Sequence, residues 1–160
     1  MAILIIFLIY LLQSQSDRLS QMPDHLLQMI IKEYPKSELV QCSYDKPRQN
    51  LPSSFIQGDF NGDSKTDFAA IVKINAPAPN CYCFVFISTD SQYVMKVLTE
   101  PYMYCSPNKR LSLDKKGSKK YDYGTDSETT LINDAFTIYL EVCNTYIYEN
   151  ADFRILHSCD

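Results

Sequence analysis

The sequence predicts an α+β fold in which one N-terminal helix packs on a mainly antiparallel β-sheet. A single stretch with helical spacing of apolar residues comes first, and from residue 54 onward short apolar segments alternate with turn-forming residues. A helix followed by consecutive strands with short connections is typical of this class. The length of 160 residues and the 46% apolar content suit one domain with a buried core.

The predicted helix runs from Pro23 or Asp24 to Tyr34. Pro23 suits the first turn, where a backbone N–H has no partner inside the helix, and Pro35 ends the helix. The apolar residues of this stretch recur at a spacing that places them on one helix face. They are Leu26, Leu27, Ile30, Ile31 and Tyr34.

Seven later segments are rich in apolar and β-branched residues and are bounded by turn residues, as strands are. They cover residues 54–57, 68–74, 81–87, 93–98, 135–142, 145–148 and 153–157, and the last three are predicted to form a meander. Residues 101–130 are the least regular part and hold six of the 15 basic residues: Lys109, Arg110, Lys115, Lys116, Lys119 and Lys120. We expect this basic run to be a solvated loop, with an anionic partner as the alternative.

The N-terminal segment is predicted to lie outside the fold. Residues 2–12 are all apolar or aromatic and are followed by four polar residues. A helix of this length spans only about 16 Å, too little to cross a bilayer. We therefore predict a signal peptide at residues 1–16, a secreted or periplasmic location and one domain at residues 17–160. An uncleaved N-terminal anchor is the alternative, because no Lys or Arg precedes the apolar run; no other membrane span is expected.

The six cysteines are consistent with export, since an even number in a secreted domain predicts up to three disulfides. Cys81 and Cys83 would point to the same face of one strand and are not expected to bond each other. Cys143 and Cys159 would face each other across the last hairpin if its loop had three residues, but not if it had two. A zinc site is disfavoured because no C-x-x-C spacing is present.

The loop at residues 59–67 carries the clearest chemical signal in the chain. Its sequence Asp-Phe-Asn-Gly-Asp-Ser-Lys-Thr-Asp places three carboxylates within nine residues. Such a concentration of negative charge favours a bound cation, and Ca²⁺ takes six to eight oxygen ligands in flexible geometry. The side chains of Asp59, Asn61, Asp63 and Asp67 and the carbonyl of Lys65 could serve as ligands, while Gly62 permits a tight turn. A solvated turn without an ion is the alternative.

This segment resembles the calcium loop of FG-GAP and VCBS-type repeats, which occur in integrin α-subunit propellers and in many bacterial secreted proteins. The similarity covers residues 58–72 and rests on the D-x-N-G-D-x-x-x-D spacing followed by an apolar strand. It implies Ca²⁺ held by Asp59, Asn61, Asp63, the Lys65 carbonyl and Asp67. More broadly, the chain is similar to small exported bacterial proteins of unassigned function that carry one such loop.

Two departures from the repeat pattern limit what the resemblance implies. The loop needs a left-handed residue at its sixth position, where Ser64 replaces the usual Gly at a cost of roughly 1 kcal/mol. The chain also holds one copy of the loop, whereas a propeller needs several blades, so a propeller is not predicted. An EF-hand is disfavoured because Ala70 stands where a bidentate Glu would be required.

The sequence does not predict a catalytic site. Both histidines, His25 and His157, are expected to be structural, and no nucleophile elbow, zinc-binding helix motif or phosphate-binding glycine loop is present. Tyr102, Tyr104, Tyr121 and Tyr123 could form a glycan- or protein-binding surface, although core packing is the favoured interpretation. The acidic balance, with a net charge of −4 and a pI near 5.1, does not indicate a nucleic-acid partner.

The leading hypothesis is a secreted, calcium-stabilised, non-catalytic module that binds a protein or a glycan. One alternative is an exported inhibitor or immunity-type protein acting on an envelope enzyme. Another is a small hydrolase, which predicts polar groups converging near Asp67 or His157.

Overall fold

A computed structural model describes residues 22–39, 54–74, 80–98, 110–139 and 143–159. The predicted signal peptide therefore lies outside the described residues. The chain divides into two compact units, Met1–Pro35 and Lys36–Asp160, and each is described by itself.

The first unit contains helix α2 (Asp24–Glu33), close to its predicted bounds. The helix begins directly after Pro23, and Leu26 and Ile30 are its buried residues. At its other end, the backbone N–H of Tyr34 donates to the Ile30 carbonyl at 2.7 Å. The amphipathic pattern is thus confirmed, while the packing of this helix on the sheet stays a prediction. Among the described residues, no helix is long and apolar enough to cross a membrane.

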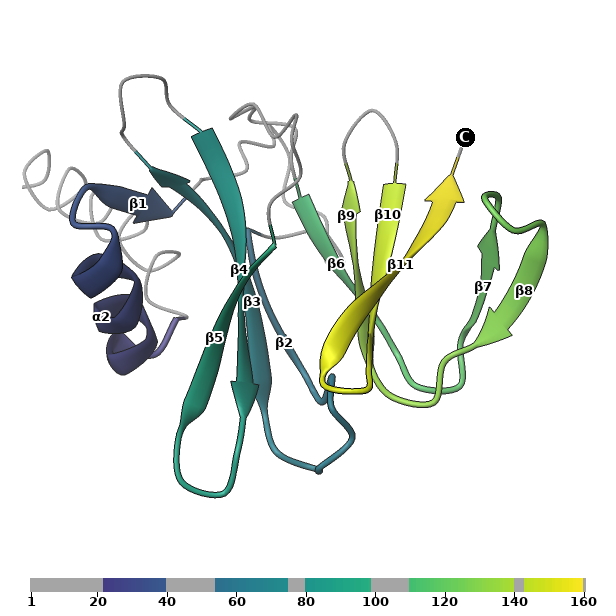
Figure 1. Ribbon diagram of the computed structural model, residues 1–160, viewed down its shortest axis with the longest axis horizontal. Helices are drawn as coiled ribbons and strands as arrows, with labels where there is room; N and C mark the ends of the chain where they lie inside the picture. Colours follow the sequence, from purple (N-terminus) through teal and green to yellow (C-terminus); the bar gives the residue numbers. More distant parts are fainter. Residues whose placement is uncertain (1–21, 40–53, 75–79, 99–109, 140–142, 160) are drawn as a thin grey trace, which may run out of the picture. The chain divides into compact units, whose positions relative to one another are not determined.

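The second unit is built from antiparallel strands in two larger sheets and a separate hairpin (Figure 1). The first sheet has the order β1-β3-β4-β5, with β2 also paired to β3. Its strands are β1 (Ser37–Leu39), β2 (Phe55–Gly58), β3 (Asp67–Ile74), β4 (Asn80–Ser88) and β5 (Tyr93–Leu98). All four strands predicted in this region are present, and β1 is additional.

The second sheet has the order β11-β10-β9-β6, and β7 pairs with β8 in the hairpin. These strands are β6 (Arg110–Asp114), β7 (Lys119–Asp122), β8 (Ser127–Thr130), β9 (Ala135–Tyr139), β10 (Cys143–Glu149) and β11 (Asp152–Cys159). The predicted meander is confirmed as β9, β10 and β11. The prediction of one sheet is wrong in detail, because these strands form a sheet of their own.

The two larger sheets share one apolar core. Ile71 and Val85 come from the first sheet, Phe136 and Tyr146 come from the second, and Phe60 joins them from the loop after β2. The Phe136 ring stacks on Tyr146 with centroids 5.2 Å apart. A smaller cluster contains Leu131, Ala135, Ile147 and Leu156. The fold is therefore β-rich, with a core built between sheets.

Residues 101–130 were expected to be irregular and solvated, but the described part from residue 110 forms strands and ion pairs, while Lys115, Lys116 and Lys119 are exposed as expected. Lys120 lies 2.6 Å from Asp114, and both side chains are largely buried, at 19% and 12% exposure. Lys119 pairs with Glu128 at 2.7 Å, and Lys115 pairs with Asp134 at 3.0 Å. The polar composition concealed β6, β7 and β8, whose charged side chains pair with residues of neighbouring strands and turns.

The disulfide Cys143–Cys159 is present, although the hairpin differs from the predicted one. The loop between β10 and β11 has two residues, Asn150 and Ala151, which have φ angles of 52° and 64°. A register shift between Cys143 and Asn144 restores the alignment, so that Cys143 pairs with Cys159. The pairing is thus confirmed, and a β-bulge provides the offset that a third loop residue would have supplied.

Cys81 and Cys83 lie two residues apart on β4, and both are buried in the shared core. Their common face follows from strand alternation, as predicted. Cys81 is also disulfide-bonded. Cys42 and Cys105 fall outside the described residues.

Candidate metal centre

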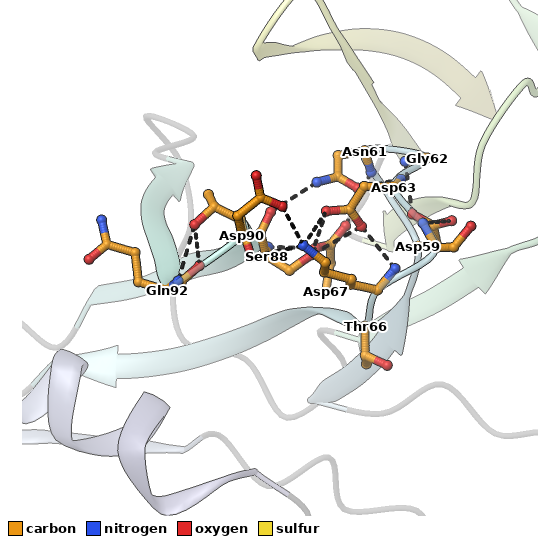
Figure 2. A network of polar contacts seen from close by, with 12 residues as sticks. Asp59, Asn61, Gly62, Asp63, Thr66, Asp67, Ser88, Asp90 and Gln92 are labelled. Carbon is orange, nitrogen blue, oxygen red and sulfur yellow. Dashed lines mark hydrogen bonds and ion pairs between the residues drawn. The ribbon is translucent and has the colours of Figure 1, made fainter.

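The loop that joins β2 to β3 lies beside the turn between β4 and β5. Figure 2 shows Asn61, Asp63 and Asp67 on the side of the loop toward Ser88, whereas Asp59 lies on its far side. Antiparallel pairing explains this placement, because Phe68 at the start of β3 is opposite Phe86 near the end of β4. The β2–β3 loop and the β4–β5 turn therefore meet at the same end of the first sheet.

The first loop residues fold their side chains back onto the loop backbone. The two carboxylate oxygens of Asp59 accept hydrogen bonds from the Gly62 and Ser64 N–H groups, at 2.8 and 3.0 Å. The Asn61 side-chain oxygen accepts from the Asp63 N–H at 3.0 Å, and an Asp63 oxygen accepts from the Lys65 N–H at 2.8 Å. Asp and Asn favour such short-range turns, because their side-chain oxygens reach a backbone N–H two residues later.

Two residues adopt the left-handed backbone conformation that a curled loop requires. Gly62 has φ 79° and Ser64 has φ 66°, so both positions match their predicted roles. A second constraint acts at Gly62, where a Cβ atom would lie 2.4 Å from the Asn133 side-chain oxygen. Glycine is therefore required at position 62 for backbone conformation and for space.

Asp67 is fully buried at the end of the loop and binds four protein donors. One carboxylate oxygen accepts from the backbone N–H groups of Phe60 and Asn61, at 2.7 and 3.1 Å. The other accepts from the N–H and the hydroxyl of Ser88, both at 2.7 Å. Burial raises the pKa of Asp67 above 3.8, against the opposing effect of these hydrogen bonds. Asp67, which was predicted to be a metal ligand, thus holds the loop to β4, and its lone pairs are all used by these four donors.

The β4–β5 turn supplies further polar contacts to the loop. The Asn61 side-chain NH₂ donates to the Ser88 carbonyl at 3.0 Å. The Lys65 ammonium lies 2.9 Å from an Asp90 oxygen and 4.0 Å from an Asp63 oxygen. From the sequence, Ser88 and Asp90 are predicted only to lie in a turn. Their polar side chains were the one indication that they could contact the loop.

A segment far along the chain completes the surroundings of the loop. The Asp59 N–H donates to an Asp134 carboxylate oxygen at 3.2 Å, and the Asp134 N–H donates to the Asp59 carbonyl at 3.1 Å. Asp134 comes directly before β9 and was not identified from sequence. No local pattern in the chain signals a contact between residues 75 positions apart.

The donor set suits a hard cation in its chemistry. Asp59, Asn61 and Asp63 offer carboxylate and amide oxygens, and each oxygen that accepts one backbone hydrogen bond keeps a second lone pair. Hydrogen bonds from Lys65 and Asn61 outweigh slight burial and hold the pKa of Asp63 below 3.8. Within the described ranges, however, no three His, Cys, Asp or Glu side chains are placed to hold a metal ion. Asp63 and Asp67 do meet at the Ser88 hydroxyl, which lies 3.3 Å from both Asp63 oxygens and 2.7 Å from an Asp67 oxygen.

His157 and the neighbouring Asp122 make several polar contacts, most of them to backbone amides or within a turn, and the hydrolase alternative stays a prediction. The His157 Nδ1 lies 3.0 Å from the Asn144 side-chain oxygen. Asp122 accepts from the backbone N–H of His157 at 3.1 Å, from the Gly124 N–H at 3.0 Å and from the Thr125 hydroxyl at 2.8 Å. Because Asp122 binds two backbone amides, it joins the β7–β8 hairpin to β11.

Tyr121 and Tyr123 are exposed, at 41% and 52%, so the favoured core-packing interpretation is wrong for these two. Their rings meet edge to face, with centroids 5.0 Å apart. The Tyr121 hydroxyl donates to Asp126. Tyr102 and Tyr104 lie outside the described residues.

The sequence matches no family model, and neither a curated protein nor a solved structure shows significant similarity to it. The fold and the loop therefore define a β-rich protein with a candidate metal centre.

Proposed function

We propose that the 59–67 loop binds Ca²⁺ and that the chain is an exported, calcium-stabilised, non-catalytic module. The observation that carries this proposal is the backbone of the loop. Left-handed conformations at Gly62 and Ser64 coincide with the spacing of oxygen donors at positions 59, 61 and 63. Left-handed non-glycine residues also occur in the β10–β11 turn, so the support for a cation site comes from their coincidence with the donor spacing.

The proposed ligands are Asp59, Asn61, Asp63, the Lys65 carbonyl and Asp67. Asp59 and Asp63 supply charge, and Asn61 supplies a neutral oxygen between them. Asp67 already accepts four hydrogen bonds. Direct ligation by Asp67 would therefore require one donor to turn away, and the Ser88 hydroxyl is the most mobile of them. Bound calcium would supply positive charge that holds these oxygens together.

The proposed role of the ion is to stabilise the fold. An extracellular module needs an affinity of only about 10⁻⁴ to 10⁻³ M. A calcium concentration tenfold above Kd would add roughly 1.4 kcal/mol to the free energy of unfolding. The Cys143–Cys159 disulfide and the disulfide bond of Cys81 support export, because such bonds persist in oxidising compartments. The exposed Tyr121 and Tyr123 support a protein or glycan partner.

Calcium titration by calorimetry, together with thermal melts in calcium and in EDTA, tests this proposal. We expect heat of binding and a higher melting temperature in calcium for the wild type, and neither for a double variant with Asp59→Asn and Asp63→Asn. Asp126→Asn is the matched control, because it removes an exposed carboxylate from the β7–β8 turn. Absence of calcium heat with an unchanged melting temperature in EDTA would show that the proposal is wrong.

A further inference from the structure

Besides its own sheet, the loop contacts the second sheet and the segment directly before β9. Asp59 and Asp134 form two reciprocal hydrogen bonds, at 3.2 and 3.1 Å, across 75 residues of chain. Directly after Asp59, the ring of Phe60 is fully buried and lies 5.1 Å from the ring of Phe136 on β9. The first two residues of the loop are therefore anchored to residues on or directly before β9.

The packing at this junction leaves no free space around the loop backbone. A Cβ atom at Gly58 would lie 2.8 Å from Leu113 and 3.2 Å from the Asp134 carboxylate. A Cβ atom at Gly62 would lie 2.4 Å from the Asn133 side-chain oxygen. Asn133 and Asp134 thus lie close to the backbone at Gly58, just before the loop, and at Gly62 within it.

Asp134 is itself held in place by donors from the segment after β6, one of which shares the oxygen that accepts from the Asp59 N–H. Its carboxylate accepts from the Lys116 N–H and from the Lys115 ammonium, both at 3.0 Å, and its side chain is 11% exposed. Burial would raise the pKa of Asp134, but these hydrogen bonds and the one from the Asp59 N–H hold it below 3.8. The carboxylate is thus an ionised, nearly buried acceptor with a defined position.

We propose that Asp134 is a positioning residue for Asp59 and couples calcium binding in the loop to the second sheet. This inference rests on the proposed function. Asp59 is the first proposed ligand of the loop. Its backbone N–H and its backbone carbonyl both form hydrogen bonds with Asp134. Without that acceptor, the backbone at Asp59 would have to become ordered when calcium binds, and this ordering would reduce the calcium affinity. Because coupling is reciprocal, bound calcium also stabilises the contact between the loop and the segment before β9.

Asp134→Ala tests the inference, and Asp114→Ala is its matched control. Like Asp134, Asp114 is a nearly buried aspartate paired with a lysine; it lies at the end of β6, is 12% exposed and pairs with Lys120. We expect both variants to lower the melting temperature in EDTA, but only Asp134→Ala to weaken calcium binding, by about tenfold in calorimetry. Wild-type calcium affinity in Asp134→Ala, or an equal loss in Asp114→Ala, would overturn the inference.

Two further measurements cover the case in which Asp134→Ala does not fold. Asp134→Asn keeps an acceptor but loses the charge, and should weaken calcium binding by a smaller factor with a native circular dichroism spectrum. Hydrogen exchange of the Asp59 and Asp134 amides in the wild type should slow when calcium is added. Calcium binding with unchanged exchange at both amides would overturn the inference, whereas no calcium binding by the wild type would overturn the proposed function beneath it.

Discussion

Asp67 is expected to be the most important single side chain for the stability of the loop, whether or not an ion is bound. Substitution by Ala removes the acceptor of four hydrogen bonds. Those from the Phe60 N–H and the Ser88 N–H are fully buried, so water cannot readily replace the lost partner. Each buried donor left unsatisfied costs about 1–3 kcal/mol, which gives about 2–6 kcal/mol for these two amides. The substitution also removes the cost of burying the carboxylate, which offsets part of this amount. We therefore expect the free energy of unfolding to fall by about 3 kcal/mol.

Ser88→Ala provides the graded comparison for Asp67→Ala. It removes the hydroxyl that donates to Asp67 at 2.7 Å but leaves the backbone amides in place. The expected loss is about 1.5 kcal/mol, the lower end of the range for one hydrogen bond to a charged group. Asp90→Ala is the neutral control, because the Asp90 side chain is fully exposed and surface changes usually fall within about 0.5 kcal/mol.

The assay is guanidinium unfolding followed by circular dichroism, carried out in EDTA so that no ligand role of Asp67 contributes. A loss below about 1 kcal/mol for Asp67→Ala, or a loss no larger than that of Ser88→Ala, would refute the assignment of Asp67 as the buried anchor of the loop. The total stability of a domain is only about 5–15 kcal/mol, so the expected change is readily measured.

Three further outcomes follow from the same structure. Ser64→Gly should relieve the left-handed strain at φ 66° and so raise the free energy of unfolding by about 1 kcal/mol, measured as a higher melting temperature. Lys65→Met should raise calcium affinity about fivefold, because it removes a positive charge beside Asp63, whereas Lys65→Arg should leave the affinity unchanged. Asp122 should contribute to acid unfolding, because the hydrogen bond from the Thr125 hydroxyl and those from two backbone amides outweigh burial and hold its pKa below 3.8. Its stabilisation is present above the unfolded-state pKa of 3.8 and is lost as pH falls through the lower folded-state pKa, so Asp122→Asn should flatten the fall in melting temperature on the acid side.

Local sequence patterns were sufficient for the elements whose residues depend mainly on their neighbours. The helix at Asp24–Glu33 follows from its apolar spacing and its flanking prolines, and β5 at Tyr93–Leu98 follows from the turn residues before it. The left-handed positions at Gly62 and Ser64 follow from the loop spacing. The Cys143–Cys159 pairing was found for a partly wrong reason, because a bulge in an antiparallel ladder leaves no clear mark in the sequence.

The tertiary structure decided everything that depends on which strands become neighbours. It divided the strands between two sheets, and it turned the basic region into β6, β7 and β8 through partners such as Asp114 for Lys120. It also buried Asp67 against Ser88 and brought Asp134 to Asp59. The loop motif names its own oxygen donors, since they lie within nine residues of chain. The groups that position those donors come from the β4–β5 turn and the segment before β9, and such contacts depend on strand pairing and core packing over long sequence separations.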